Sequence, residues 1–267
     1  MKTFEFTGKT VVVTGASGGI GEAFARALSR RGATLVLVAR TEAKLTALAA
    51  ELGNAYAVPV DLTEKGAARR VFDAVTARGL DVDVLVNNAG YGLHGPFDAL
   101  PPASQREQID LNVGALVDLT QLFLPAIQRR RGGIINVASV AGYQPTPYMA
   151  VYGATKAFVL SFSDALWAEM SPYGVRVLCV SPGVTETGFF ERSGEGAAGG
   201  LAGKKASPHD VVRVALAAFD AGRSSVVHGA ANTMLTMATR FFSRAFAARA
   251  IATLTRPKDL ALPDHTA

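Results

Sequence analysis

Short runs of β-branched residues alternate with longer stretches of helical periodicity from the start of the chain to about residue 228. Seven of the short runs predict strands, at Thr10–Val13, Thr34–Ala39, Ala55–Val60, Val82–Val86, Gly133–Val137, Val175–Val180 and Ser224–Val227. The stretches between them predict helices, at Gly19–Arg31, Thr41–Leu52, Glu64–Ala77, Ala103–Arg130, Ala150–Ser171 and Pro208–Ala221. This alternation is typical of βαβ units, so we expect an α/β protein with one doubly wound, seven-stranded parallel sheet and helices on both faces.

A glycine-rich segment, residues 182–207, follows the sixth expected strand. A connection of this length inside a compact domain is usually mobile or functional. It is either a flexible linker or a lid over a site. We favour a substrate lid, because the segment starts at a strand end, where open α/β sheets bind ligands.

The last periodic stretch, residues 232–256, predicts an amphipathic helix with a broad apolar face and with Arg240 and Arg244 on the other side. It does not predict a membrane-spanning helix, because each interior arginine opposes insertion by roughly 2.5–3.5 kcal/mol near a bilayer centre. The helix can close over a pocket, contact another subunit, or lie on a membrane surface with its arginines toward anionic lipid. Arg249 falls on the apolar side, which argues against deep membrane burial, so we rank pocket or subunit packing first.

Composition and charge narrow the class of protein further. The 267 residues are 49% hydrophobic, which suffices for a single domain over residues 1–267. The net charge of +5 comes mostly from arginines spread along the helices, so we expect no nucleic acid partner. Cys179 is the only cysteine, which excludes an intrachain disulfide, and the N-terminus shows no signal-peptide pattern. We therefore expect a cytoplasmic protein.

The segment VVVTGASGGIGEAFARAL, residues 11–28, places a strand, a glycine-rich turn and a helix in immediate succession. In that context the amide groups at the start of the helix can bind a pyrophosphate. Gly15, Gly19 and Gly21 occupy the positions where the backbone must approach it closely. A tight structural turn is the alternative, but the flanking strand and helix favour a dinucleotide site.

Tyr152 and Lys156, in the segment YGATK, lie four residues apart, and Ser139 precedes them beyond the fifth expected strand. On a helix this spacing brings both side chains to one face, where an ammonium can stabilise a phenolate. A free tyrosine has a pKa of about 10 and is a poor proton donor at neutral pH until its anion is stabilised. A surface tyrosine beside a surface lysine can have the same spacing by chance. The interpretation of the pair as an acid/base pair therefore depends on the glycine loop elsewhere in the chain.

These segments together resemble the classical short-chain dehydrogenase/reductase (SDR) family, with a similarity that runs over residues 8–230. The matching residues are Thr14, Gly15, Gly19 and Gly21 for the pattern TGxxxGxG, Asn87, Asn88, Ala89 and Gly90 for NNAG, Pro182 and Gly183 for PG, and Asn112, Ser139, Tyr152 and Lys156 for the catalytic tetrad. The resemblance implies a Rossmann-type fold.

The resemblance also implies a nicotinamide cofactor. The implied contacts are Gly15, Ser17, Gly19, Ile20, Gly21, Arg40, Asp61, Leu62, Asn88, Ala89, Gly90, Tyr152, Lys156, Pro182, Gly183, Thr185 and Thr187. NAD-preferring members carry an acidic residue at the end of the second strand, where this chain has Ala39 followed by Arg40. An arginine attracts a 2′-phosphate, so we expect NADP(H) to be preferred over NAD(H). Gly18 replaces the basic residue that many NADP-binding members have in the glycine loop, and Arg40 could instead be a solvated residue.

By resemblance, hydride passes between the nicotinamide and a carbonyl carbon while Tyr152 exchanges a proton with the substrate oxygen. Lys156 would lower the pKa of Tyr152, Ser139 would hold the substrate oxygen, and Asn112 would support Lys156 through a water. The implied substrate contacts are Ser139, Tyr143, Tyr152 and Phe189. They suit a hydrophobic carbonyl or alcohol, and no metal is implied.

The family is commonly dimeric or tetrameric, so the resemblance implies a homodimer or homotetramer. The alternative function is a catalytically idle NADP(H)-binding sensor or scaffold on the same fold. Such a protein needs the glycine loop but has no use for Tyr152 and Lys156 together, so the tetrad favours an enzyme.

Overall fold

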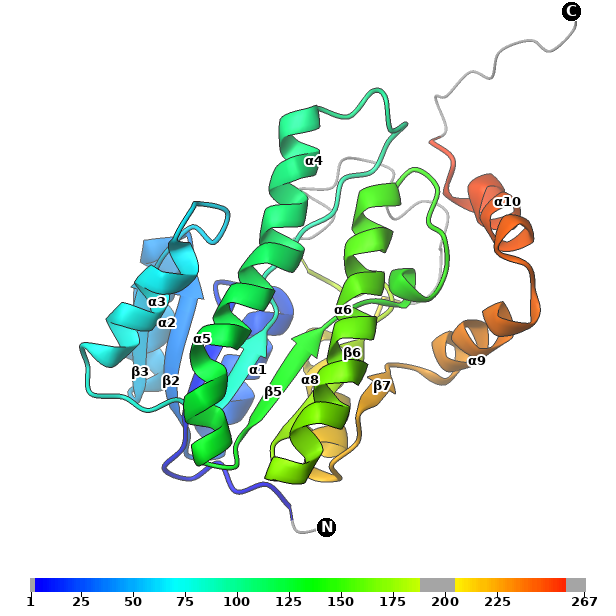
Figure 1. The fold of residues 1–267 in the computed structure, drawn as a ribbon. Coiled ribbons are helices and arrows are strands. Elements are labelled where there is room, and N and C mark those ends of the chain that lie inside the picture. Colours follow the sequence, from blue (N-terminus) through cyan, green and yellow to red (C-terminus); the bar gives the residue numbers. More distant parts are fainter. Residues whose placement is uncertain (1–2, 188–204, 258–267) are drawn as a thin grey trace, which may run out of the picture.

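The computed structural model describes residues 3–187 and 205–257 and contains one parallel sheet of seven strands (Figure 1). The strands are β1 (Thr10–Thr14), β2 (Thr34–Ala39), β3 (Ala55–Pro59), β4 (Val84–Asn87), β5 (Gly133–Val137), β6 (Arg176–Ser181) and β7 (Ser225–Val227). Their order is β3-β2-β1-β4-β5-β6-β7. The chain thus winds outward from β1, returns to β4 and winds outward in the other direction, which confirms the doubly wound sheet predicted from the sequence.

Helices cover both faces of this sheet (Figure 1). Their bounds are α1 (Gly19–Arg30), α2 (Glu42–Leu52), α3 (Ala67–Thr76), α4 (Pro102–Ile109), α5 (Leu116–Arg129), α6 (Ala150–Met170) and α8 (Pro208–Asp220). Successive side chains of a strand point to opposite faces. In β1, Val11 and Val13 therefore pack with α1, α2 and α8, whereas Val12 packs with α3, α5 and α6. The two layers of core fix the carboxyl ends of the strands at one edge of the molecule.

The long helix expected at residues 103–130 is interrupted by a π-helix, η1 (Asp110–Ala115), between α4 and α5. The sequence pattern predicted one continuous helix and did not disclose the interruption. Short π-helical turns inside α-helices occur frequently at functional sites. Here the turn contains Asn112.

Within the described parts of the chain, the stretch Pro102–Arg129 alone is long and apolar enough, by length and composition, to cross a membrane. Leu119, Phe123 and Ile127 from this stretch are buried against the sheet. A core helix of an α/β protein meets the same criterion, and these contacts account for the apolar character.

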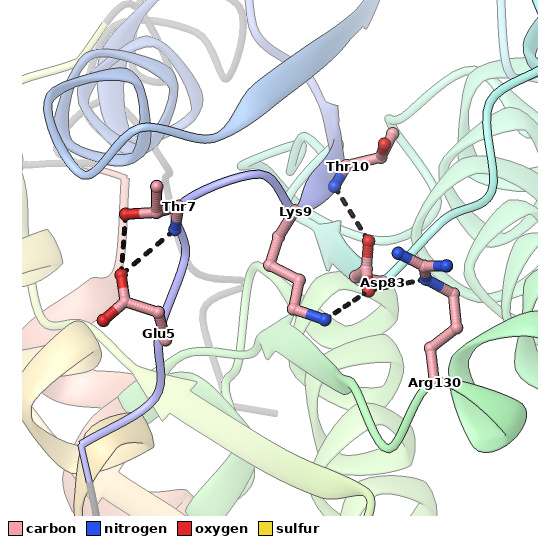
Figure 2. Close-up of polar contacts among 6 residues, drawn as sticks. All are labelled: Glu5, Thr7, Lys9, Thr10, Asp83 and Arg130. Atoms are coloured by element: carbon pink, nitrogen blue, oxygen red, sulfur yellow. Dashed lines mark hydrogen bonds and ion pairs between the residues drawn. The ribbon is translucent and has the colours of Figure 1, made fainter.

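A buried carboxylate, Asp83, joins three segments at the amino ends of the strands, as Figure 2 shows. Its Oδ2 accepts a hydrogen bond from the Thr10 amide at 2.9 Å, and its Oδ1 pairs with Lys9 Nζ at 2.9 Å and Arg130 Nε at 2.7 Å. Burial acts to raise the pKa of Asp83, but the hydrogen bonds from Arg130, Thr10 and Lys9 outweigh it, and the pKa lies below its ordinary value of 3.8. Nearby, Glu5 accepts hydrogen bonds from the amide and hydroxyl of Thr7.

The single helix expected at residues 232–256 is two helices. They are α9 (Ala230–Ala238), which continues into the 3-10 turn η4 (Thr239–Phe241), and α10 (Arg244–Thr255). Ser243 starts α10 as its N-cap, since its side-chain oxygen accepts a hydrogen bond from the Phe246 amide at 3.2 Å. Because the Ser243 side chain binds this amide, the chain starts a new helix here and does not continue the preceding one. The apolar faces of α9 and α10 can therefore point in different directions.

Candidate active site

A cleft of about 1220 Å³ opens at the carboxyl ends of the strands. It brings together most of the residues that the sequence predicts for the site: Gly15, Ser17, Gly19, Ile20, Arg40, Asp61, Leu62, Asn88, Ala89, Gly90, Ser139, Tyr152, Lys156, Pro182, Gly183, Thr185 and Thr187 all line it. Gly21, Asn112 and Tyr143 lie behind or beside the lining instead. Phe189 and the central part of the expected lid, residues 188–204, are outside the described residues.

The glycine loop is held to the end of β4 by Thr14. The Thr14 hydroxyl accepts hydrogen bonds from the amides of Asn88 and Ala89 at 2.9 and 3.0 Å, and Asn88 Nδ2 donates to the Thr14 carbonyl at 2.9 Å. Gly15 has φ of +65°, and a Cβ at Gly21 would lie 2.2 Å from the Gly15 carbonyl oxygen. The motif glycines therefore allow α1 to begin directly against the loop.

The start of α1 is open toward the cleft. Gly18 occupies the N-cap position, and no side chain caps the helix there. The first amides of a helix have no partner within it, and together with the helix dipole they bind phosphate well. The pyrophosphate of a dinucleotide fits this position.

Opposite charges face each other at the end of the cleft formed by β2 and β3. Arg40 Nη1 lies 3.5 Å from Asp61 Oδ2, and Asp61 Oδ1 accepts hydrogen bonds from the Thr63 amide and hydroxyl at 3.0 and 2.7 Å. Burial acts to raise the pKa of Asp61, but the Thr63 hydrogen bonds and the Arg40 charge lower it overall. Lys44, in the first turn of α2, also lines the cleft, and it was not predicted from the sequence.

Tyr152 and Lys156 lie one turn apart on α6, and both are buried. Lys156 Nζ donates a hydrogen bond to the Val137 carbonyl at 2.8 Å and lies 5.8 Å from the centre of the Tyr152 ring. Ser139 caps the 3-10 turn η2 (Val140–Tyr143), and its Oγ accepts a hydrogen bond from the Ala141 amide at 3.1 Å. The three side chains predicted for proton transfer therefore converge where β5 ends.

Burial dominates the titration of both residues. It raises the pKa of Tyr152 to about 12, although a hydrogen bond with Ser139 acts in the opposite direction. It lowers the pKa of Lys156 to about 8. The sequence reasoning expected Lys156 to bring the pKa of Tyr152 down. The direction found is the opposite, because the ammonium is directed to the Val137 carbonyl and the phenol is desolvated.

Asn112 clamps the loop after β4 onto α6. Its Oδ1 accepts from the Tyr91 amide at 3.1 Å, and its Nδ2 donates to the Tyr91 carbonyl at 2.9 Å and to Thr155 Oγ1 at 3.0 Å. Thr155 in turn donates to the Tyr152 carbonyl at 2.8 Å. Sequence reasoning missed Thr155, although it lies inside the YGATK segment. The chain of bonds links the π-helix to the backbone that carries Tyr152.

The two described ends of the segment 182–207 are joined at the cleft. Thr185 and Ala206 form a parallel bridge, with the Glu186 amide donating to the Ala206 carbonyl and the Ala206 amide to the Val184 carbonyl, both at 2.9 Å. Thr187 lies against Gly19 of the glycine loop. The stem of the expected lid thus extends across the cleft from β6 to α1.

The C-terminal helices close the other side of the cleft. Leu235, Ile251 and Thr255 line it, the Thr255 carbonyl is 2.9 Å from His94 Nε2, and the Thr255 hydroxyl donates to the Pro147 carbonyl at 3.2 Å. These contacts agree with the pocket packing that the sequence reasoning ranked first. The part of the chain that the structure describes holds no cluster of histidine, cysteine and carboxylate side chains suited to a metal ion.

Known proteins resemble this chain in both sequence and structure. A family model for short chain dehydrogenases matches residues 9–198. An uncharacterized oxidoreductase of Staphylococcus epidermidis is 39% identical over 185 residues, which are 68% of this chain and 80% of that protein. A very-long-chain 3-oxoacyl-CoA reductase of Phaeosphaeria nodorum is 38% identical over 190 residues, 67% of this chain and 56% of that protein. A solved short-chain dehydrogenase from Sphingobium yanoikuyae in complex with NADPH is 32% identical, has a TM-score of 0.77, and the match covers 96% of this chain and 99% of the other.

Proposed function

The chain belongs to the short-chain dehydrogenase/reductase family, and we propose that it interconverts a hydrophobic carbonyl compound and its alcohol with NADP(H), with Tyr152 as the proton donor in reduction. Membership makes it an NAD(P)-dependent oxidoreductase. The observation that carries the finer proposal is the convergence of Ser139, Tyr152 and Lys156 on a cleft whose far end is the uncapped start of α1.

The nucleotide end of the cleft fits NADP(H). The first amides of α1 are available for the pyrophosphate, and Arg40 and Lys44 supply positive charge where a 2′-phosphate would lie. Ala39 ends β2 without a carboxylate that would repel that phosphate. Bound NADPH supplies the hydride, and the proton must come from the protein.

The protein's own groups handle the proton. Tyr152 keeps its proton at neutral pH because burial raises its pKa to about 12, so it would donate only as the substrate oxygen becomes an alkoxide, a stronger base than the phenolate. Ser139, which hydrogen-bonds with Tyr152, would hold the same oxygen in place. Lys156 would stabilise the phenolate that remains, because its ammonium is close to the ring in a desolvated site.

The substrate side of the cleft favours an apolar molecule. Met149, Leu235 and Ile251 contribute aliphatic surface there, beside the polar side chains of Gln144 and His94. The similarity to a very-long-chain 3-oxoacyl-CoA reductase supports an acyl chain as one candidate. We therefore propose a hydrophobic ketone, aldehyde or acyl group as the substrate.

The decisive experiment replaces Tyr152 by phenylalanine. We expect purified Tyr152→Phe to bind NADPH as the unchanged protein does and to lose carbonyl reduction by orders of magnitude. Tyr173→Phe, at an exposed position on the 3-10 turn Ser171–Tyr173, is the matched control and should keep full activity. Full turnover by Tyr152→Phe would refute the role of Tyr152, and NADPH binding without activity of the unchanged protein on a broad carbonyl panel would favour a sensor.

The assembly is proposed to be a homodimer or homotetramer. Phe158 and Trp167 of α6 are large apolar side chains that remain partly exposed in the single chain. Exposed apolar surface on a helix is typical of subunit contacts. Sedimentation velocity of Trp167→Glu should show a lighter species than the unchanged protein, and a monomeric unchanged protein would contradict the proposal.

A further inference from the structure

The two C-terminal helices carry large apolar side chains on the side that faces away from the cleft. We define the C-terminal apolar face as Met234, Met237, Phe241, Phe242, Phe246 and Leu254. Phe241 is 85% exposed and Met234 is 73% exposed. Scattered single apolar residues are normal on a protein surface, but a cluster of aromatic and methionine side chains on two adjacent helices marks an interaction site.

The spacing within each helix groups these residues. Phe246 and Leu254 lie two turns apart along one ridge of α10, and the ring of Phe246 stacks on that of Phe242 with centroids 5.2 Å apart. Met234 and Met237 lie three residues apart on α9. In Figure 1 α9 follows β7, α10 lies farther along the chain and away from that strand, and both helices stand outside the sheet layers.

Internal packing uses the opposite side of the same helices. Thr236 is buried, Leu235 and Ile251 line the cleft, and Thr255 is bonded to His94 and Pro147. None of these contacts involves a residue of the C-terminal apolar face. The outward side is therefore available for a partner while the inward side closes the cleft.

The charge of the segment identifies the kind of partner. Residues 230–256 contain four arginines, Arg240, Arg244, Arg249 and Arg256, and no aspartate or glutamate. Arg244 and Arg249 are exposed beside the apolar ridge of α10. Aromatic and aliphatic side chains flanked by arginine alone complement an apolar surface that carries negative charge.

A second copy of the chain fits this face poorly. In a two-fold contact the same patch meets itself, so the arginines of one copy would be brought toward a patch whose only charged residues are arginines. The segment has no carboxylate to pair with them, and juxtaposed like charges disfavour association. An anionic bilayer surface accepts both the apolar side chains and the arginines.

We propose that the C-terminal apolar face binds the surface of membranes that contain anionic lipid, with α9 and α10 lying in the interface plane. Arg249 is compatible with this placement, since its long side chain can extend from the ridge of α10 to the lipid headgroups. Because the inward side of the same helices lines the cleft, a membrane-bound molecule would hold its cleft near the bilayer. That consequence for a hydrophobic substrate rests on the proposed function.

Vesicle flotation of the full chain tests the proposal. The probes are vesicles of phosphatidylcholine alone and of phosphatidylcholine with phosphatidylglycerol. We expect the unchanged protein to float with the anionic vesicles, to float at least about tenfold less with the neutral ones, and to detach at high salt. The double variant Phe242→Glu with Phe246→Glu should bind the anionic vesicles at least about tenfold less than the unchanged protein. Tyr173→Glu changes an exposed aromatic residue outside the C-terminal apolar face and should float as the unchanged protein does.

Two further readouts separate the possible failures. Circular dichroism and NADPH binding of the double variant should match the unchanged protein, since neither phenylalanine lines the cleft. Tyr152→Phe should float normally. An unchanged protein that floats with anionic vesicles but reduces no carbonyl compound would count against the proposed function alone. Absence of flotation with anionic vesicles would overturn the membrane proposal, and so would a double variant that floats normally. If the double variant instead falls to a lower oligomer in sedimentation velocity without any flotation of the unchanged protein, the face is a subunit contact.

Discussion

Asn112 and Thr155 form a buried hydrogen bond, in which Asn112 Nδ2 donates to Thr155 Oγ1 at 3.0 Å. Asn112 belongs to the π-helix between α4 and α5, and Thr155 belongs to the α6 turn that carries Tyr152 and Lys156. Because Thr155 also donates to the Tyr152 carbonyl, this pair positions the backbone under the proton donor.

Thr155→Ala should lower both stability and turnover. The substitution leaves a buried Asn112 N–H without its partner, which costs about 1–3 kcal/mol. We expect kcat to fall about tenfold or more while the KM for NADPH changes little, because Thr155 is not among the residues that line the cleft. Thr155→Ser keeps the hydroxyl and should restore kcat. Equal losses of kcat in the alanine and serine variants would contradict the positioning role.

Charge at the end of β2 should decide between the two nicotinamide cofactors. Arg40→Asp removes a cation and adds an anion near the expected 2′-phosphate, so the kcat/KM for NADPH should fall by about 10- to 100-fold, in line with about 1.5–3 kcal/mol for a charge-assisted hydrogen bond. The value for NADH should change far less. Arg69→Asp, an exposed position on α3, controls for net charge. A preference of the unchanged protein for NADH would refute our interpretation of Arg40.

Reduction should slow as the pH rises through about 8. Lys156 has its pKa lowered to about 8 by burial, so above that pH it loses the charge that stabilises the Tyr152 phenolate. Tyr152 remains protonated over the same range because its pKa is about 12. The measurement is kcat for NADPH-dependent reduction between about pH 6 and 10 at saturating substrate. A flat profile through pH 8 would show that Lys156 does not act by its charge.

Asp83→Asn should destabilise the fold without touching the cleft. The variant removes the buried negative charge that balances Lys9 and Arg130. We expect the free energy of unfolding to fall by about 3 kcal/mol. This is the low end of the range for broken buried ion pairs, because both cations are partly exposed. Urea unfolding monitored by circular dichroism gives the value. Substitution of the exposed Asp73 by asparagine is the matched control and should stay within about 0.5 kcal/mol.

The same residue should contribute to the acid sensitivity of the protein. The pKa of Asp83 is lower in the folded chain than its ordinary value of 3.8, so its contribution to stability is complete above that value and is lost as the pH falls through the folded pKa. The stability of the unchanged protein should therefore drop in acid more steeply than that of Asp83→Asn. Parallel acid limbs of the two unfolding curves would contradict this.

The sheet and the motif residues could be predicted because both depend on residues that are neighbours in the sequence. Apolar runs such as VVV at residues 11–13 can be buried on both faces only in a covered parallel strand, and the glycine loop with its flanking elements is contiguous. The strands agree with the structure to within two residues, and Gly15 and Gly19 of the loop line the cleft.

The features that escaped prediction depend on contacts between distant segments. The π-helix places Asn112 against Tyr91, and these hydrogen bonds join residues 21 positions apart. The direction of the Tyr152 pKa follows from burial, which no spacing in the sequence measures. The bond between His94 and Thr255 joins residues 161 positions apart. The break at Ser243 did have a local signal, a serine at a helix start, and it was overlooked.

The Asp83 cluster and the cleft lie at opposite ends of the same strands. The five residues of β1 extend over about 16 Å, which exceeds the range over which substitutions usually influence one another. Changes that strengthen the amino end of the sheet should therefore add to changes in the cleft without interfering with them. A directed-evolution programme can raise thermal tolerance at one end and alter substrate choice at the other, and treat the two as independent variables.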